Sequence, residues 1–305
     1  MIESILNQFR LTVLEKGLGI YGINIYQKGQ NDLSYQWRSS DKVCLYSGSK
    51  TFASVAIGIC QDEGLLKLYD TVLNFFPEYK DIASEHSDTI KIRDLLHMSS
   101  GKKVFYFSGE EEEMKTNDWA KLFFSDSMKC GAGEAFFYSN ACTYMLSRIV
   151  EKVSGVTLRD FLVPRLFSPL GIFNPQWHTC PDGHTLGGTE LFLTIKEFSQ
   201  LGLVFLNGGV YNDKQIISKE YIKNATTDII STANAGFDDI ENSMGYGYQL
   251  WQCSYKGAYR ADGMYGQFCI VFPGKEAVIT VTSHEENRAN DILRAIYKDI
   301  IPYLD

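Results

Sequence analysis

The sequence predicts an α+β fold in which an antiparallel sheet is flanked by N- and C-terminal helices and carries an inserted, mainly helical domain. Runs rich in β-branched and aromatic residues occur near both ends of the chain, which is typical of strands. Between them, residues 81–208 consist of segments with apolar residues at helical spacing. Amphipathic helices are expected at residues 2–16 and 288–301. We therefore expect a sheet domain formed by residues 1–80 and 209–305, with the functional site in the cleft between the two domains.

Capping and turn residues divide these parts into elements. Ser139 or Asn140 is placed to cap the helix that follows it, and Thr194 with Glu197 forms a capping box for the next long helix. Ser218 is placed to cap a short helix. The expected strands are residues 20–27, 33–38, 246–251, 258–262, 267–272 and 277–282.

The segment from Tyr46 to Phe52 opens a nearly continuous apolar run that reaches Cys60 without a proline. Such a run indicates a helix that is buried on all sides. Ser47 and Lys50 are three residues apart, so they share one helix face with Cβ atoms about 5–6 Å apart. A desolvated lysine can have a pKa low enough to take the serine proton, and a helix N-terminus favours negative charge there. Ser47 and Lys50 are therefore the candidate nucleophile and base.

The Ser-x-x-Lys spacing by itself is a weak signal, because a chain of this length is expected to contain about one match by chance. The alternative interpretation of Ser47 and Lys50 is an ordinary helix N-terminus with a surface lysine. Three other pairs have the same spacing: Ser39 with Lys42, Ser99 with Lys102, and Ser100 with Lys103. Only the Ser47 pair opens a long apolar helix, which favours it over the others.

Tyr138 and Asn140 form the only Tyr-x-Asn pair in the chain. A phenol beside a lysine ammonium is suited to pass protons between a serine and a leaving group. The alternative is that Asn140 only caps a helix and Tyr138 belongs to the core.

The segment from Tyr259 to Phe268 joins two expected strands and contains Gly263 and Gly266. Glycines let a substrate lie close to the backbone, so that a strand-edge N–H can serve as a second oxyanion donor beside that of Ser47. The alternative is a glycine-containing loop between strands.

Taken together, these segments resemble the motifs of the serine β-lactamase and penicillin-binding-protein superfamily, in particular its class C β-lactamase-like branch with esterases and amidases. Residues 47–50 are similar to the Ser-x-x-Lys motif, and residues 138–140 to the Tyr-x-Asn motif. The resemblance covers nearly the whole chain and implies a β-lactamase/DD-peptidase-like fold. Intervening stretches that also resemble the family are residues 92–101, 168–172, 203–209 and 246–248.

The third family motif is Lys-Thr-Gly or a histidine variant, and this chain has Ala261-Asp262-Gly263 in its place. In the family the lysine or histidine helps to hold a substrate carboxylate, which an alanine side chain cannot do. With Gly266 and Gln267 following, the segment resembles the esterase and short-amide hydrolase members. Arg260 is adjacent, but strand alternation should point it to the face opposite Ala261, so it is not expected to replace the lysine.

The resemblance implies acyl transfer through a covalent acyl-Ser47, with Lys50 and Tyr138 sharing the roles of base and acid. The order in which they act stays open, because the two groups titrate as a coupled pair. Asn140 would hold Lys50 or the substrate, and the N–H groups of Ser47 and Met264 would form the oxyanion hole. Three functions compete: an intracellular esterase or amidase, a β-lactamase or DD-peptidase, and a catalytically idle binding protein on the same fold.

The resemblance implies a small acyl substrate, and the composition argues against other classes of partner. The net charge of −8 argues against nucleic acid, and no run of apolar residues is long enough to span a membrane. The N-terminus lacks a signal-peptide pattern, and the seven scattered cysteines indicate reduced thiols, so we expect a cytoplasmic protein. Residues 178–184 contain metal-ligand residue types at no standard spacing, so neither a metal nor a cofactor is expected. The oligomeric state stays open.

Loops are expected to form the walls of the substrate pocket. The three candidate loops are residues 102–115, 177–188 and 228–243. Their aromatic side chains suggest an apolar acyl or aryl group in the substrate, although each of them could equally belong to the core. The aromatic residues are Phe105, Tyr106, Phe107, Trp177 and Phe237.

Overall fold

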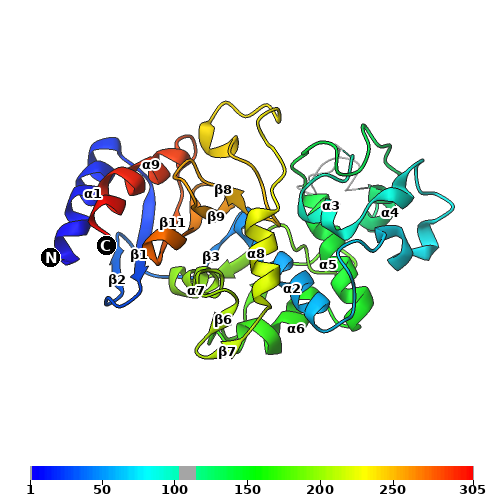
Figure 1. Ribbon diagram of the computed structural model, residues 1–305, viewed down its shortest axis with the longest axis horizontal. Coiled ribbons are helices and arrows are strands. Elements are labelled where there is room, and N and C mark those ends of the chain that lie inside the picture. The colour runs from blue at the N-terminus through cyan, green and yellow to red at the C-terminus, as the bar shows by residue number, and fades with distance from the viewer. Residues whose placement is uncertain (1, 103–114, 305) are drawn as a thin grey trace.

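The computed structural model describes residues 2–102 and 115–304, so Lys103 and the aromatic residues at 105–107 lie outside the described residues. Its main sheet has six strands in the order β2-β1-β11-β10-β9-β8 (Figure 1), and every pairing is antiparallel. Strands from both ends of the chain thus meet in one sheet, which confirms the predicted α+β fold. The strands are β1 Ile20–Gln27, β2 Leu33–Gln36, β8 Trp251–Gln252, β9 Tyr259–Gly263, β10 Gln267–Phe272 and β11 Ala277–Ser283.

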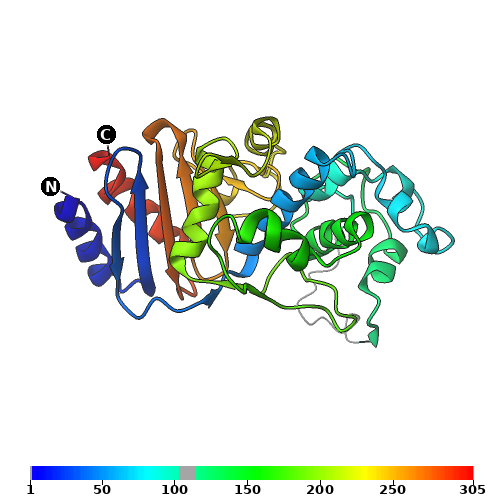
Figure 2. The same cartoon turned by 90° about the horizontal axis from the view of Figure 1, so that it is seen from below.

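Helices cover both faces of this sheet. Helices α1 (Ile2–Lys16) and α9 (Ala289–Asp299) lie on one face, and α7 (Ile195–Leu206) lies on the other (Figures 1 and 2). Successive strand residues point to opposite faces, so β10 contributes Ile270 to the core under α9 and Cys269 to the core under α7. The sheet is therefore buried on both sides, which explains why its central strands are almost entirely apolar.

The part of the molecule that lies beside the sheet is mainly helical (Figure 1, right), and we call it the helical half. Helix α2 packs against α5 and α6 in this half, although its residues precede the range 81–208. Helix α7, by contrast, lies within that range and packs on β10 and β11 of the sheet. The helices are α2 Lys50–Asp62, α3 Ile92–Leu96, α4 Trp119–Ser125, α5 Asn140–Ser154, α6 Leu158–Leu162 and α8 Lys219–Thr227. Among the described residues, none of the helices has the length and apolar character to cross a bilayer.

The predicted helix caps are present. The Ser139 hydroxyl accepts from the N–H of Ala141 at the start of α5, and Ser218 caps α8 in the same manner. Thr194 and Glu197 form the reciprocal capping box at the start of α7. These bonds join residues two or three apart, which is why the sequence pattern is sufficient to predict them.

The prediction of a strand at residues 246–251 is wrong, because only Trp251, the last residue of that range, belongs to β8. The segment turns back on itself instead: Tyr246 forms a bridge with Trp251, and Gln249 has a left-handed φ of 62° that a strand does not allow. The Gln249 side chain donates to the carbonyl of Leu96 at 2.8 Å, so a contact far along the chain holds the turn.

Two small sheets were not predicted from the sequence. The first contains three strands in the order β3-β5-β4 and lies near the start of α2, and the second is the hairpin of β6 and β7. Strands of two or three residues are too short to show an alternating pattern. Their bounds are β3 Val43–Cys44, β4 Gln176–Trp177, β5 Leu191–Leu193, β6 Val210–Tyr211 and β7 Lys214–Gln215.

Strand β9 passes very close to the 3-10 turn Tyr46–Ser49 that precedes α2. A Cβ atom built at Gly263 would lie 2.1 Å from the carbonyl oxygen of Leu45 and 3.1 Å from the amide nitrogen of Gly48. Both neighbours are backbone atoms, which cannot move aside as a flexible side chain can. Glycine at position 263 therefore lets the sheet meet the turn that carries Ser47.

We predict that Gly263→Ala lowers the free energy of unfolding by about 1–3 kcal/mol, because the added methyl group has no space. Urea-induced unfolding followed by circular dichroism measures the loss. Gly274→Ala is the matched control, since a Cβ atom at Gly274 would meet nothing within 4 Å and its φ is not positive. Equal stabilities of the two variants would show that the close approach does not constrain the fold.

Candidate active site

Ser47 and Lys50 lie where the 3-10 turn Tyr46–Ser49 continues into α2. The residue before Ser47, Tyr46, has a left-handed φ of 47°, which is rare for a non-glycine residue and bends the chain sharply there. Ser47 is half-buried, and Lys50 is only 1% exposed. The ammonium nitrogen of Lys50 lies 2.9 Å from the hydroxyl oxygen of Ser47. The predicted pair therefore exists, with the lysine buried and not on the surface.

The Lys50 amine is surrounded by oxygen atoms from distant parts of the chain. Besides Ser47 Oγ, it contacts Asn140 Oδ1 at 2.5 Å and the carbonyl oxygen of Gly188 at 2.8 Å. Burial disfavours the charged form and lowers the Lys50 pKa to about 7, while Cys142 and then Asp262 act in the opposite direction. The neutral amine is therefore accessible near neutral pH.

The arrangement of these acceptors determines what a neutral Lys50 amine can do. A neutral amine has two N–H donors and one lone pair, and both Asn140 Oδ1 and the Gly188 carbonyl oxygen can only accept. With the two N–H bonds directed at these oxygens, the lone pair is left for the Ser47 hydroxyl proton. The geometry therefore suits Lys50 as the base that deprotonates Ser47.

Tyr138 lies beside both Ser47 and Lys50. Its ring centroid is 4.9 Å from the Lys50 nitrogen, and its ring stacks on Trp251 with centroids 5.6 Å apart. Burial raises the Tyr138 pKa well above its ordinary value, and a hydrogen bond with Ser47 only partly opposes that rise. Tyr138 is therefore a neutral phenol near neutral pH, able to donate a proton. Asn140, the first residue of α5, is held in place because Ser139 caps the helix.

The loop after β9 presents backbone near Ser47. Gly263 lies against the turn that carries Ser47, as described above, and Met264 follows it with a side chain that is 59% exposed. Within residues 2–102 and 115–304, the N–H groups of Ser47 and Met264 donate no hydrogen bond. Two uncommitted N–H groups near a serine hydroxyl are what an oxyanion hole requires.

The structure places the other predicted residues of this segment away from the site surface. The methyl group of Ala261 packs into the core with Thr51 and Cys269. Gln267 is buried, and its side chain exchanges hydrogen bonds with the backbone of Ser283 on β11. A Cβ atom at Gly266 would lie 2.5 Å from Ser283 Oγ. Gly266 and Gln267 therefore shape the turn that carries Met264, and the structure does not bring Ala261 to Ser47.

Arg260 and Asp262 point to the face of β9 opposite Ala261, as strand alternation predicts. The Arg260 side chain is fully buried, and its Nε donates to Asp262 Oδ2 at 2.7 Å. Its terminal nitrogens donate to the carbonyl oxygens of Gln252 and Glu241, each at 3.0 Å. All of the Arg260 guanidinium is thus engaged internally. The segment presents no free cation to a substrate.

The other Ser-x-x-Lys pairs that the structure describes do not form a comparable site. Lys42 donates to the backbone carbonyl of Phe173, at the surface. Lys102 is buried, and burial lowers its pKa to about 8, but its amine donates to Ser84 and Ser87 and not to Ser99. A buried lysine alone therefore does not identify the site. Within the described part of the chain, no group of three or more His, Cys, Asp or Glu side chains could hold a metal ion.

Two residues of the site were not identified from the sequence. Gly188 contributes its carbonyl oxygen to Lys50 from a segment 138 residues away, and Trp251 supports the Tyr138 ring. A backbone carbonyl carries no residue-type signal, and a buried tryptophan resembles any core residue. The predicted wall residue Trp177 is in the core against Phe52, whereas Phe237 is 37% exposed and packs on Trp251.

Known structures share this fold over nearly the whole chain. A family VIII carboxylesterase superposes with a TM-score of 0.75 at 15% sequence identity and covers 97% of each chain. A D-stereospecific amidohydrolase from Streptomyces sp. superposes with a TM-score of 0.72 at 15% identity, covering 97% of this chain and 98% of its own. A penicillin-binding protein homolog from Caulobacter crescentus superposes with a TM-score of 0.78 at 15% identity, covering 98% and 97%.

Sequence comparison agrees with the structural comparison. Protein flp from Staphylococcus aureus (strain MW2) is 26% identical over 160 residues, which are 52% of this chain and 30% of that protein. The chain thus spans less than a third of the length of this relative. The sequence profile of the Beta-lactamase family matches residues 21–300, which confirms the resemblance drawn from the motifs. With this match, the chain belongs to the beta-lactamase family and has its serine hydrolase fold.

Proposed function

We propose that the protein is an esterase or amidase that hydrolyses small acyl substrates through a covalent acyl-Ser47 intermediate. The observation that carries the proposal is the buried amine of Lys50, 2.9 Å from Ser47 Oγ, with its pKa lowered to about 7. A carboxylesterase and an amidohydrolase are among the proteins that share the fold, which supports an ester or amide substrate.

The proposed reaction begins when the lone pair of Lys50 takes the Ser47 hydroxyl proton and Ser47 Oγ attacks the carbonyl carbon. The N–H groups of Ser47 and Met264 donate to the oxygen that becomes negative; one such donor contributes about 10²–10³ in rate. Tyr138 gives its proton to the leaving oxygen or nitrogen as the bond to carbon breaks, and regains one from the Lys50 ammonium. Water then attacks the acyl-Ser47 with the same groups acting in reverse order.

The charge around the third segment favours a substrate without a carboxylate. β-Lactams and peptides ending in D-alanine carry a carboxylate, which the family's Lys-Thr-Gly lysine helps to hold. In this chain Arg260 is buried and fully bonded, and Asp262 adds a carboxylate on the same face of β9. The exposed apolar side chains of Phe237 and Met264 are instead suited to a neutral, apolar group.

The predicted cytoplasmic location stays a prediction. All seven cysteines are free thiols in the structure.

A first prediction concerns the nucleophile. A fluorophosphonate probe should label the wild-type chain at Ser47, and Ser47→Ala should abolish labelling because the hydroxyl beside the Lys50 amine is gone. Intact-mass spectrometry measures the adduct, with Ser99→Ala as the matched control from another Ser-x-x-Lys pair. Labelling that persists in Ser47→Ala would remove Ser47 from the proposed role.

A second prediction concerns pH. Lys50 must be neutral to act as a base and its pKa is about 7, so kcat/KM for a p-nitrophenyl ester should fall about tenfold per pH unit below pH 7 and level off above it. The initial rate of ester hydrolysis is measured at each pH, and the background rate of the Ser47→Ala variant is subtracted. These corrected rates give the pH profile of kcat/KM.

The variant Asn140→Asp tests that Lys50 is the titrating group. A carboxylate in place of the amide, 2.5 Å from the Lys50 nitrogen, favours the ammonium and should move the acid limb upward by about 1–3 pH units. The control variant Asn117→Asp makes the same change at an asparagine outside the site, and it should leave the pH profile unchanged. An acid limb that stays near pH 7 in Asn140→Asp would contradict the assignment to Lys50.

A third prediction concerns substrate charge. Short-chain p-nitrophenyl esters should be hydrolysed with a kcat/KM at least about tenfold above that for a chromogenic cephalosporin, because residues 259–268 present no free cation to the cephalosporin carboxylate. Steady-state kinetics with both substrates measures the ratio. Faster turnover of the cephalosporin would favour a β-lactamase, and labelling of Ser47 with turnover of neither would favour an idle binding protein.

A further inference from the structure

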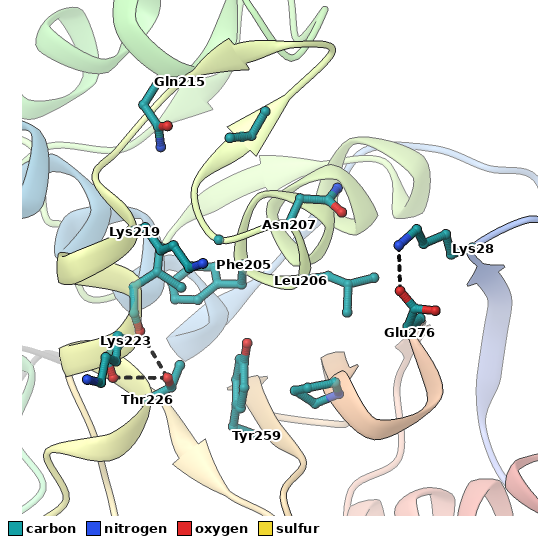
Figure 3. Close-up of a pocket in the computed structure, with 14 residues that line it drawn as sticks. Lys28, Phe205, Leu206, Asn207, Gln215, Lys219, Lys223, Thr226, Tyr259 and Glu276 are labelled. Atoms are coloured by element: carbon teal, nitrogen blue, oxygen red, sulfur yellow. Dashed lines mark hydrogen bonds and ion pairs between the residues drawn. The ribbon is translucent and has the colours of Figure 1, made fainter.

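A cavity lies away from Ser47, at the opposite end of β9. Its volume is about 670 Å³, and it is bordered by the C-terminus of α7, by α8, and by the turn that follows β10 (Figure 3). The ion pair between Lys28 and Glu276, with N and O atoms 2.6 Å apart, forms one margin. Tyr259 lines the cavity and Gly263 contacts the Ser47 turn, so four residues of extended strand, about 13 Å, separate the two places.

Tyr259 and Lys219 bring hydrogen-bond donors to this cavity, as do Asn207 and Lys223. Tyr259 is only 6% exposed, and its hydroxyl points into the cavity in Figure 3. Among the described residues, neither the Tyr259 hydroxyl nor the Lys219 ammonium has a hydrogen bond or an ion pair. The Tyr259 ring is buried, but its hydroxyl oxygen opens to the cavity, where solvent or a ligand can supply the hydrogen-bond partner that the described residues do not. Burial raises the Tyr259 pKa, which keeps the hydroxyl a donor.

Lys219 is an exposed residue that lines the cavity. It begins α8, and its methylene stem runs along Gly208, with its Cγ, Cδ and Cε 3.5–3.9 Å from a Cβ atom built at Gly208. In Figure 3 its ammonium points toward Phe205. Lys223, one turn later on α8, lies at the rim and adds a second positive charge in a chain whose net charge is −8. The local charge is therefore opposite in sign to that of the whole molecule.

The rest of the lining is mostly apolar. Phe205 and Leu206 at the end of α7, Ile222 on α8 and Pro273 after β10 contribute hydrocarbon surface. A cavity with a few convergent polar groups on apolar walls has the general character of a small-molecule site.

We propose that this cavity is a second binding site for a small amphipathic carboxylate. The carboxylate accepts from the Lys219 ammonium and the Tyr259 hydroxyl, and the hydrocarbon part packs against Phe205, Leu206 and Ile222. This inference does not rest on the reaction proposed at Ser47.

Calorimetric titration of the full chain with sodium octanoate tests the proposal, with the neutral isostere octanamide as the ligand control. Octanoate should bind about tenfold more tightly than octanamide, because a hydrogen bond to a charged group is worth more than one to a neutral group. Lys219→Met and Tyr259→Phe should each weaken octanoate binding by about five- to tenfold. Lys214→Met, which removes an exposed lysine from the neighbouring strand β7 outside the cavity, should leave binding unchanged.

Repeating the titration on the chain treated with the fluorophosphonate separates this cavity from the Ser47 site. Octanoate affinity that is unchanged by the treatment supports the second site, and affinity lost in parallel with labelling places the ligand at Ser47 and overturns it. If the fluorophosphonate does not label Ser47, the Lys219→Met, Tyr259→Phe and Lys214→Met variants still show whether octanoate binds in the cavity. Equal affinities for octanoate and octanamide, equal effects of Lys219→Met and Lys214→Met, or an absence of octanoate binding would each overturn the proposal.

Discussion

The candidate site depends on the burial of one amine. Lys50 is placed among oxygens contributed by three separate segments, those of Ser47, Asn140 and Gly188. Removing the ammonium from water is unfavourable, and this desolvation is the largest cause of its lowered pKa. The hydrogen bonds to neutral carbonyl oxygens orient the amine without restoring the charged form as a carboxylate would. The burial that lowers the Lys50 pKa also requires that the rest of the helical half encloses α2.

The sheet completes the site through backbone and not through a charged side chain. Gly263 allows β9 to touch the Ser47 turn, and Gln267 and Gly266 hold the next turn against Ser283. The cation of this strand, Arg260, is turned away and paired with Asp262 in the interior. Removing one partner of such a buried pair is strongly unfavourable, so Arg260 is not available to a substrate. The family fold is therefore retained while its usual recognition of a carboxylate at this strand is missing.

Much of the fold could be predicted because its signals are local. The Ser139 cap, the Thr194–Glu197 box and the β-branched and aromatic residues of strands β1, β10 and β11 are signals from neighbours in sequence. The prediction was wrong for residues 246–251, where a bond from Gln249 to Leu96 holds a left-handed turn. The small β3-β5-β4 sheet was missed for a related reason, since its strands are too short to show a pattern and pair only across the fold.

At Ser47 and Lys50, the sequence by itself determined that a hydroxyl and an amine three residues apart open a buried helix, and its motifs indicated the family. The spacing of a helix is local, so this much follows from residue order. Only the tertiary structure decided that Lys50 meets Asn140 and Gly188, 90 and 138 residues away, and that Lys102 meets other serines. It also decided that Ala261 faces the core while Met264 lies at the site. These outcomes depend on how distant segments pack, because desolvation and hydrogen-bond partners are properties of the folded surroundings and not of the spacing.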